Sequence, residues 1–215
     1  MEKAFIFDMD GVIVDSEKLW QKNLPGFFNS YFGANIAKKI IGKTYGVSMG
    51  TVFQWANQYG FYGDSKSFKD GFNNLAQNIY QKAKITEGIE DLITTLKREN
   101  FKLGLVSCSP LRWIYHIIKK INCLSMFNEI ISVDDRSDLR SKPSPDGYIF
   151  IMNKLSVLPQ KTIVIEDSPV GILSAKSSGA LVICLKQFQP TNYFAKGAHV
   201  YVENIKQLIQ MVELI

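Results

Sequence analysis

Short apolar runs alternate with amphipathic helical patterns along most of this chain, and that alternation constrains its fold more than any other feature. Five β-branched runs have the length of buried strands, at residues 5–7, 103–106, 130–133, 162–165 and 181–185. Between them, apolar residues recur at i, i+3, i+4 and i+7. Alternating strand and helix predict an α/β core: a three-layer, Rossmann-like, doubly wound parallel sheet with helices on both faces.

The segment of residues 16–82 departs from this alternation. It has no convincing strand pattern and is rich in aromatic and amide side chains. Apolar residues recur at helical spacing between Phe68 and Ile79, and Pro25 predicts an interruption of the first helix. We therefore expect two parts, a core formed by residues 1–15 and 83–215 and an inserted all-helical domain of residues 16–82.

Charge and hydropathy limit the partners of this chain. Its 215 residues include 25 Lys and Arg against 20 Asp and Glu, a formal net charge of +5 without a basic cluster. No apolar run approaches membrane-spanning length, and the first apolar run ends too early, at Asp8, for a signal peptide. We expect a cytoplasmic protein that binds neither nucleic acid nor membrane, with a charge that suits a small anionic substrate.

Cysteine and histidine content excludes two kinds of site. Cys108, Cys123 and Cys184 are an odd number with no C-x-x-C spacing, which indicates reduced thiols. With only His116 and His199, a histidine metal cluster is excluded. Neither a disulfide framework nor a zinc site is therefore expected.

Two carboxylates follow the first predicted strand, in the sequence DMDG at residues 8–11. Side chains two residues apart on an extended chain can point to the same side, and Gly11 lets the backbone turn away. Ligands bind beyond the carboxyl ends of the strands in an open parallel sheet. Two like charges so close need a cation, and hard oxygen ligands favour Mg²⁺. A solvated turn is the alternative interpretation of this motif on its own.

The second strand end offers groups that suit a phosphate. Ser107 and Cys108 follow the apolar run at residues 103–106, and Pro110 then suits the first turn of a helix. A phosphate placed there would meet free backbone N–H groups and the Ser107 hydroxyl. Helix capping by Ser107 or Ser109 is the alternative.

Two further loops complete the pattern. Lys142 lies in a proline-bounded loop that gives its ammonium group a defined direction, whereas a surface lysine is the plain alternative. Glu166 and Asp167 end another predicted strand, where helix capping by Asp167 is the alternative. Because all four features end predicted strands or open helices, they can converge on one edge of one sheet.

Together the four motifs resemble those of the haloacid dehalogenase superfamily, over essentially the whole chain. DMDGV at residues 8–12 is similar to the first motif, VS at 106–107 to the second, KP at 142–143 to the third, and EDSPVGI at 166–172 to the fourth. The helical insert resembles the family's cap domain. DSE at residues 15–17 resembles the subgroup that holds β-phosphoglucomutases and small sugar-phosphate phosphatases.

The resemblance implies a Mg²⁺-dependent reaction through an aspartyl phosphate. Asp8 would attack phosphorus, and Asp10 would protonate the leaving oxygen and then take a proton from water. The residues alone do not order these two aspartates. The implied metal ligands are the Asp8 carboxylate, the Asp10 backbone carbonyl, Glu166 and Asp167, and the implied phosphate-binding residues are Ser107, Cys108 and Lys142.

We therefore expect a monomeric phosphatase of small phosphorylated metabolites such as sugar phosphates. The first alternative is a β-phosphoglucomutase-like phosphomutase, but no arginine occurs from Met1 to Lys97 to grip a second phosphate. The second is a receiver-like signalling module that holds phosphate on aspartate, which the helical insert and the acid at Asp10 disfavour. Lys43, Thr44 and Tyr45 are the residues of the insert that we expect to face the substrate.

Overall fold

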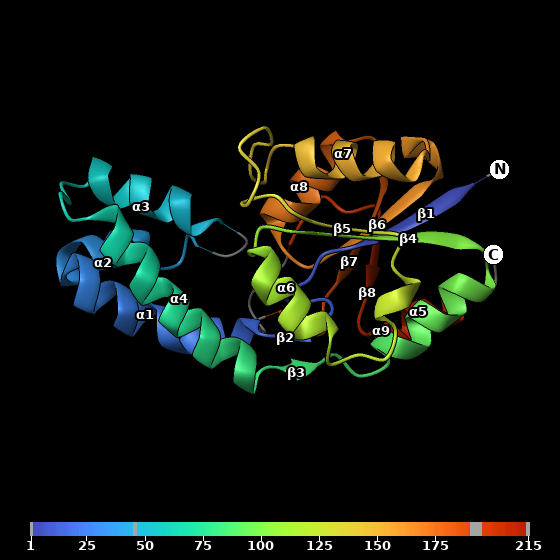
Figure 1. Cartoon of the computed structure of the whole chain (residues 1–215), viewed down its shortest axis with the longest axis horizontal. Coiled ribbons are helices and arrows are strands. Elements are labelled where there is room, and N and C mark those ends of the chain that lie inside the picture. Colours follow the sequence, from blue (N-terminus) through green and yellow to red (C-terminus); the bar gives the residue numbers. More distant parts are fainter. Residues whose placement is uncertain (1, 45–46, 190–194, 214–215) are drawn as a thin grey trace.

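The structure is a computed structural model that describes residues 2–44, 47–189 and 195–213. Its centre is a parallel sheet of six strands in the order β5-β4-β1-β6-β7-β8 (Figure 1). Counted among these six alone, the order is that of a doubly wound fold, which confirms the predicted α/β class. The strands are β1 Lys3–Phe7, β4 Phe101–Ser107, β5 Glu129–Ser132, β6 Thr162–Glu166, β7 Leu181–Leu185 and β8 Val200–Val202.

Strand β1 lies at the centre of the sheet and serves both of its faces. Phe5 and Phe7 pack into one apolar cluster, whereas Ala4 and Ile6 pack into the other. This is the two-residue period of a strand that is buried on both sides. Its near-continuous apolar sequence follows from that position.

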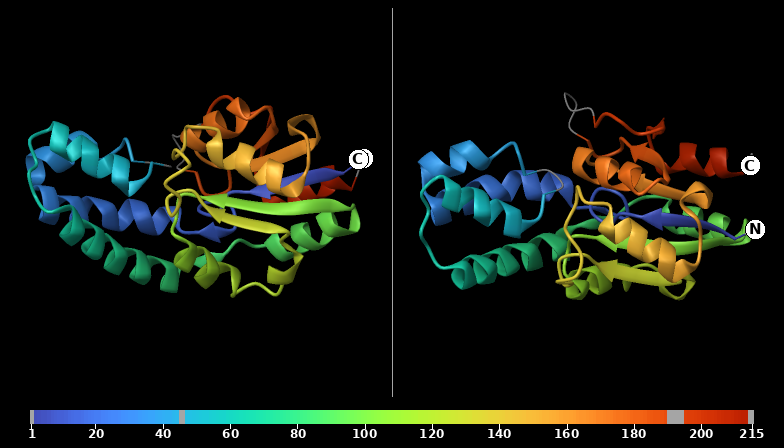
Figure 2. Two further views of the ribbon diagram at one scale, coloured as in Figure 1. Left: turned by 45° about the horizontal axis from the view of Figure 1, so that its top comes forward. Right: turned by 90° about the horizontal axis from the view of Figure 1, so that it is seen from above.

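Helices cover the two faces as separate layers (Figures 1 and 2). On one face lie α5 Ile89–Arg98, α6 Leu111–Ile118 and α9 Ile205–Val212, whose buried residues belong to the cluster of Phe5 and Phe7. On the other face lie α7 Asp146–Leu155 and α8 Pro169–Ser177, which pack with Ala4 and Ile6. The three-layer arrangement matches the prediction.

The described part of residues 17–82, without 45–46, forms four helices beside the carboxyl edge of the sheet, which we call the helical unit (Figure 1). Phe28, Phe32, Ile40, Val52 and Phe68 are among the residues of its own apolar cluster. A short antiparallel ladder of β2 and β3 joins the chain where it enters and leaves the unit. The elements are β2 Val14–Asp15, α1 Glu17–Phe32, α2 Ala34–Ile40, α3 Met49–Gln58, α4 Ser65–Lys82 and β3 Lys84–Ile85.

The expected interruption at Pro25 is wrong, because α1 runs through it. Proline removes one backbone donor from a helix. The next turn, however, buries Phe28 in the core of the helical unit and packs Phe27 against the same cluster. We infer that this aromatic packing outweighs the lost backbone hydrogen bond.

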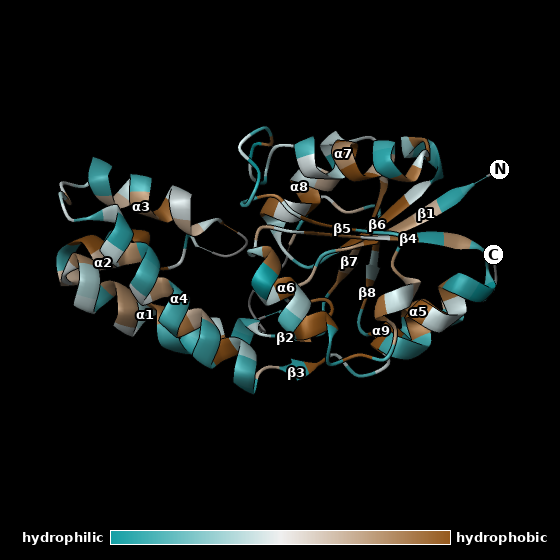
Figure 3. Cartoon of the chain, viewed as in Figure 1, coloured by the Kyte–Doolittle hydropathy of each residue, from teal (hydrophilic) through white to brown (hydrophobic). Residues whose placement is uncertain are grey.

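Hydropathy follows the layers. Hydrophobic colour concentrates on the strands of the sheet, and hydrophilic residues cover much of the outer faces of the helices (Figure 3). In the described part of the chain, no helix combines the length and apolar character that crossing a membrane requires.

Candidate active site

The ends of three neighbouring strands build the candidate site. In the sheet, Phe7 of β1 lies opposite Leu105 of β4 on one side and Ile165 of β6 on the other. The residues that follow these positions therefore leave the sheet side by side. Asp8, Ser107 and Glu166 reach one edge in this way, although they are far apart in the sequence.

Lys142 links two of these strand ends. Its ammonium group donates a hydrogen bond to Asp8 Oδ1 at 2.6 Å and another to Glu166 Oε1 at 2.6 Å. The Tyr148 hydroxyl donates to the same Glu166 oxygen at 2.7 Å. Burial opposes the charged form of Lys142, but the charges of Asp8 and Glu166 outweigh it and raise the pKa of this lysine. Lys142 therefore stays a cation in the fold.

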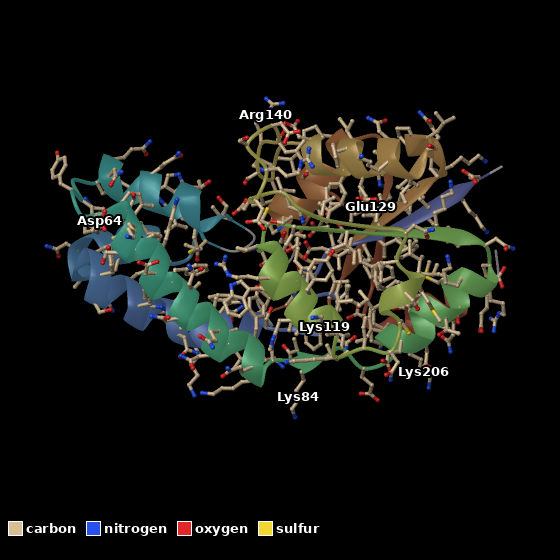
Figure 4. The ribbon with its side chains drawn as sticks, viewed as in Figure 1. Asp64, Lys84, Lys119, Glu129, Arg140 and Lys206 are labelled. Carbon is tan, nitrogen blue, oxygen red and sulfur yellow. The ribbon has the colours of Figure 1, made fainter. Side chains whose placement is uncertain are left out.

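The loop before α7 carries two cationic side chains that point in different directions. Arg140 points outward from this loop (Figure 4), where it pairs with Asp146, and its side chain is 79% exposed. Lys142 comes from the same loop, yet its side chain is only 6% exposed. The prediction that this loop holds the lysine in a defined direction agrees with this geometry.

Three carboxylates gather beside that lysine. Asp8, Glu166 and Asp167 each offer an oxygen, and these oxygens lie within 4.8 Å of one another. These three carboxylates share their surroundings with one buried ammonium group, that of Lys142. Burial, only partly opposed by Lys142, raises the pKa of Asp8 to about 8. A buried set of three carboxylate oxygen donors fits a hard divalent cation such as Mg²⁺.

Two glycines allow these carboxylates to approach the backbone. Gly11 has φ of +77°, and a Cβ built on it would lie 1.8 Å from Asp167 Oδ2. A Cβ on Gly171, in the first turn of α8, would lie 2.0 Å from Glu166 Oε1. Any larger residue at either position would displace a carboxylate of the group.

Asp10 lies in different surroundings from Asp8. The Ser16 hydroxyl donates to Asp10 Oδ1 at 2.6 Å, and Ser109 donates to Oδ2 at 2.9 Å. Tyr80 donates to the same carboxylate, 3.0 Å from Oδ1 and 3.1 Å from Oδ2. Burial raises the pKa of Asp10, and these hydroxyls oppose the rise. The Asp10 carboxylate is thus placed to gain and release a proton.

The phosphate-binding residues predicted at the second strand end lie in the same place. Ser107 is buried, and its oxygen accepts the Ser109 backbone N–H at 2.9 Å, which leaves its own proton available to donate. Burial raises the pKa of the Cys108 thiol to about 12. A thiol that stays protonated is a weak nucleophile, which argues against covalent chemistry at Cys108.

A cleft of about 1060 Å³ joins this edge to the helical unit. Asp8, Asp10, Ser107 and Lys142 line its floor, and Thr44 is among the residues that line it from the helical unit. Lys43 is not among the lining residues, and its ammonium group lies 3.5 Å from the Tyr59 hydroxyl. Tyr45 lies outside the described residues.

Some residues of the site were not assigned a role from the sequence. Ser16 and Glu17 belong to the DSE motif, which resembled the subgroup without giving either side chain a function. Tyr80 and Ser109 touch Asp10, and Arg112 lines the cleft. Tyr80 lies on the buried face of α4, where the helical period of 3.6 residues indicates core packing. The neighbouring sequence therefore does not indicate that its hydroxyl belongs to a site.

The family model for haloacid dehalogenase-like hydrolases matches residues 5–185. The chain belongs to this family. The match begins inside β1 and ends with β7, so it includes all four strand-end motifs. The haloacid dehalogenase-like fold therefore brings together the residues that the sequence motifs had indicated.

Similar proteins include enzymes of more than one activity. The chain is 24% identical over 188 residues to a phosphorylated carbohydrates phosphatase of Thermotoga maritima, covering 82% of each chain. It is 29% identical over 198 residues to the β-phosphoglucomutase of Bacillus subtilis, covering 87% of this chain and 85% of that one. A haloacid dehalogenase-like hydrolase structure from Bacteroides fragilis has a TM-score of 0.79 at 19% identity, covering 97% of this chain and all of the other, which supports the fold.

Proposed function

We propose that this protein is a Mg²⁺-dependent phosphatase that hydrolyses small phosphomonoesters through a phosphate ester on Asp8. Lys142 carries this proposal, because one buried ammonium group touches both the proposed nucleophile, Asp8, and Glu166. Such a cation can neutralise a phosphoryl group that approaches an anionic nucleophile. Family membership and the named phosphatase of Thermotoga maritima support the same reaction class.

The first half of the reaction would use both aspartates. An Asp8 oxygen bonds to phosphorus as the bond from phosphorus to the leaving oxygen breaks. The leaving oxygen keeps that electron pair and takes the Asp10 proton. Ser107 and Lys142 hold the phosphoryl oxygens during the transfer.

The second half restores the enzyme. A water oxygen bonds to phosphorus, the phosphorus bond to Asp8 breaks, and Asp10 takes the proton of the water. Asp8, Glu166 and Asp167 would hold Mg²⁺, with the Asp10 backbone carbonyl as a further ligand. Bound there, the ion would screen the negative charge between Asp8 and the phosphoryl group.

The leaving group would lie under the helical unit, acting as a cap over the site. Trp20, Gln21, Gln54 and Asn73 line that side of the cleft. Neutral amides can donate and accept hydrogen bonds with hydroxyls, and an aromatic face suits the apolar side of a sugar. We therefore propose phosphorylated sugars or polyols as the substrate class.

A phosphomutase is the second candidate, and one observation favours it. Arg112 of α6 lines the cleft from the core side and donates a hydrogen bond to Asn73 of α4. Among the described residues, no carboxylate forms an ion pair with this arginine. A core arginine could thus bind a second phosphate where the helical unit offers no arginine.

One assay separates the two candidates. The purified protein is incubated with a panel of phosphorylated sugars and polyols, with Mg²⁺ or with EDTA, and released phosphate is measured. β-Glucose 1-phosphate is included with a trace of glucose 1,6-bisphosphate, and glucose 6-phosphate is followed in parallel. Phosphate release that EDTA abolishes supports the phosphatase. Glucose 6-phosphate without phosphate release supports the mutase, and neither product from any substrate rejects both.

A further inference from the structure

Asp10 receives hydrogen bonds from hydroxyls on three separate segments of the chain. Ser16 comes just before α1, Tyr80 lies near the end of α4, and Ser109 follows β4. Tyr80 and Ser109 also hydrogen-bond each other at 2.7 Å. Asp10, Tyr80 and Ser109 therefore form a triangle of close polar contacts. The two hydroxyls have one proton each, so when Asp10 is ionised only two sides of the triangle hold a proton at a time.

The Tyr80 side chain is buried, and several contacts hold it in place. Tyr80 is 1% exposed, and its ring lies between Trp20 and Trp113, at centroid distances of 5.8 and 5.7 Å. Its backbone carbonyl accepts a hydrogen bond from the Lys120 ammonium group at 2.7 Å. Burial raises the pKa of Tyr80, so the phenol remains a neutral donor. The acceptors within reach of this donor are the two Asp10 oxygens and the Ser109 hydroxyl.

The geometry of the carboxylate explains what this donor can do. A carboxylate that is held at one oxygen only can still rotate about its bond to Cβ. Ser16 contacts Oδ1 and Ser109 contacts Oδ2, while Tyr80 is within hydrogen-bond distance of both. Contacts at both oxygens fix the plane of the group. A proton donor must be aligned with the leaving oxygen, and small displacements of such groups reduce rates strongly.

We propose that Tyr80 is a positioning residue: together with Ser109, it orients the Asp10 carboxylate toward the leaving oxygen. This inference rests on the proposed function, in which Asp10 gives its proton to that oxygen as the phosphorus bond breaks. Tyr80 itself keeps its proton and acts through the Asp10 carboxylate. If Tyr80 served only to pack the core, loss of its hydroxyl would reduce kcat/KM equally for every substrate.

The test compares two kinds of leaving group in the Tyr80→Phe variant, which keeps the ring and removes the hydroxyl. An alkyl phosphate such as glycerol 3-phosphate needs a proton on its leaving oxygen, whereas p-nitrophenolate leaves as a stable anion. The parameter measured is kcat/KM, because it covers only the steps up to the aspartyl phosphate. We expect kcat/KM to fall about 10- to 30-fold for the alkyl ester and less than about threefold for p-nitrophenyl phosphate.

Tyr31→Phe is the matched control. The Tyr31 hydroxyl donates to the Asp64 carbonyl at 2.8 Å within the helical unit, away from Asp10. We expect this variant to leave both kcat/KM values unchanged. Equal losses with both substrates in Tyr80→Phe, or no loss with either, would overturn the positioning role. A wild-type enzyme that hydrolyses neither ester would overturn the proposed function as well.

Ser109→Ala is the second variant for the same assay, for use if Tyr80→Phe folds poorly. It removes the other corner of the triangle, and we expect the same selective loss with the alkyl ester. In the double variant, the two losses should be less than additive, since both hydroxyls act through one carboxylate. Fully additive losses would mean that Tyr80 and Ser109 act independently, against the proposal.

Discussion

Asp8 and Asp10 are two residues apart, yet their carboxylates meet opposite kinds of partner. Asp8 touches a buried ammonium group and lies with Glu166 and Asp167 in a group of charges. Asp10 touches hydroxyl groups of Ser16, Tyr80 and Ser109. One aspartate is therefore set among charges, and the other among neutral donors.

This difference supports the separate roles that we propose for two chemically identical side chains. Ammonium and metal cations favour the ionised carboxylate that a nucleophile needs. Hydroxyls can serve a carboxyl group in both of its protonation states, because each can donate or accept. Burial raises the pKa of both carboxyl groups, so the difference between them lies in their partners: a cation beside Asp8 and hydroxyls beside Asp10. These partners support Asp8 as the nucleophile and Asp10 as the acid, an order that their spacing left open.

The largest effect is expected from Asp8→Asn. An amide cannot form the ester, so phosphate release should fall by at least about 10⁴-fold and no labelled protein should appear with ³²P substrate. Asp70→Asn, an exposed position on α4, is the control and should keep full activity. Melting temperature verifies that both variants fold. A labelled, active Asp8→Asn protein would place the nucleophile elsewhere.

Asp10→Asn should give a smaller loss with a different signature. Loss of a general acid and base slows turnover by about 10²- to 10⁴-fold. Because water activation fails as well, the phosphate ester on Asp8 should persist and be detected by mass spectrometry after p-nitrophenyl phosphate is added. If neither aspartate variant carries a label, or both do, the division of roles between Asp8 and Asp10 is incorrect.

Asp167→Ala tests the charged surroundings of Asp8. The variant removes one of three gathered oxygens but leaves Asp10 and its hydroxyls in place. We expect the Mg²⁺ concentration for half-maximal activity to rise by about tenfold or more. The measurement is phosphate release as a function of Mg²⁺, with Asp91→Ala at the start of α5 as the control. An unchanged titration would remove Asp167 from the metal site.

Local patterns predicted much of this fold because each strand and helix is encoded in a short window. The five runs that alternate with helices all form strands, and the residues at three predicted strand ends meet at one edge with Lys142 of the loop before α7. Strand β8 was missed because Val200–Val202 is too short to show a period. The ladder of β2 and β3 has two residues in each strand and leaves even less of a pattern.

Side-chain direction was harder to predict than position in the chain. Lys43 was expected to face the substrate because of its loop, but its contact with Tyr59 depends on how α2 and α3 pack. Tyr80 meets Asp10 across 70 positions of sequence, a contact that only the tertiary fold creates. Long-range contacts of this kind have no counterpart in a single window of sequence, which is why the Asp10 side of the site was the less complete prediction.

The last expected effect is on stability and concerns Glu17, which lines the cleft with Asp8 and Asp10. Burial, followed by the charges of Asp10 and Asp8, raises the pKa of Glu17 from 4.5 to about 8. A raised folded-state pKa means that its contribution to stability is fully present below pH 4.5 and is lost as pH rises through 8. Glu17→Gln, which cannot ionise, should therefore gain stability relative to wild type as pH increases.

Thermal unfolding in EDTA at pH 5.5 and 8.5 measures this gain. We expect Glu17→Gln to exceed wild type by about 4 kcal/mol at pH 8.5, or on the order of 10 °C in melting temperature, and by about 1 kcal/mol at pH 5.5. Glu87→Gln, at an exposed position, should show no such pH dependence. Added Mg²⁺ should reduce the gain, because a cation beside Asp8 offsets the charge that opposes ionised Glu17. A gain equal at both pH values would mean that Glu17 is ionised throughout, and that the Asp10 side of the cleft carries more negative charge than its hydroxyl partners suggest.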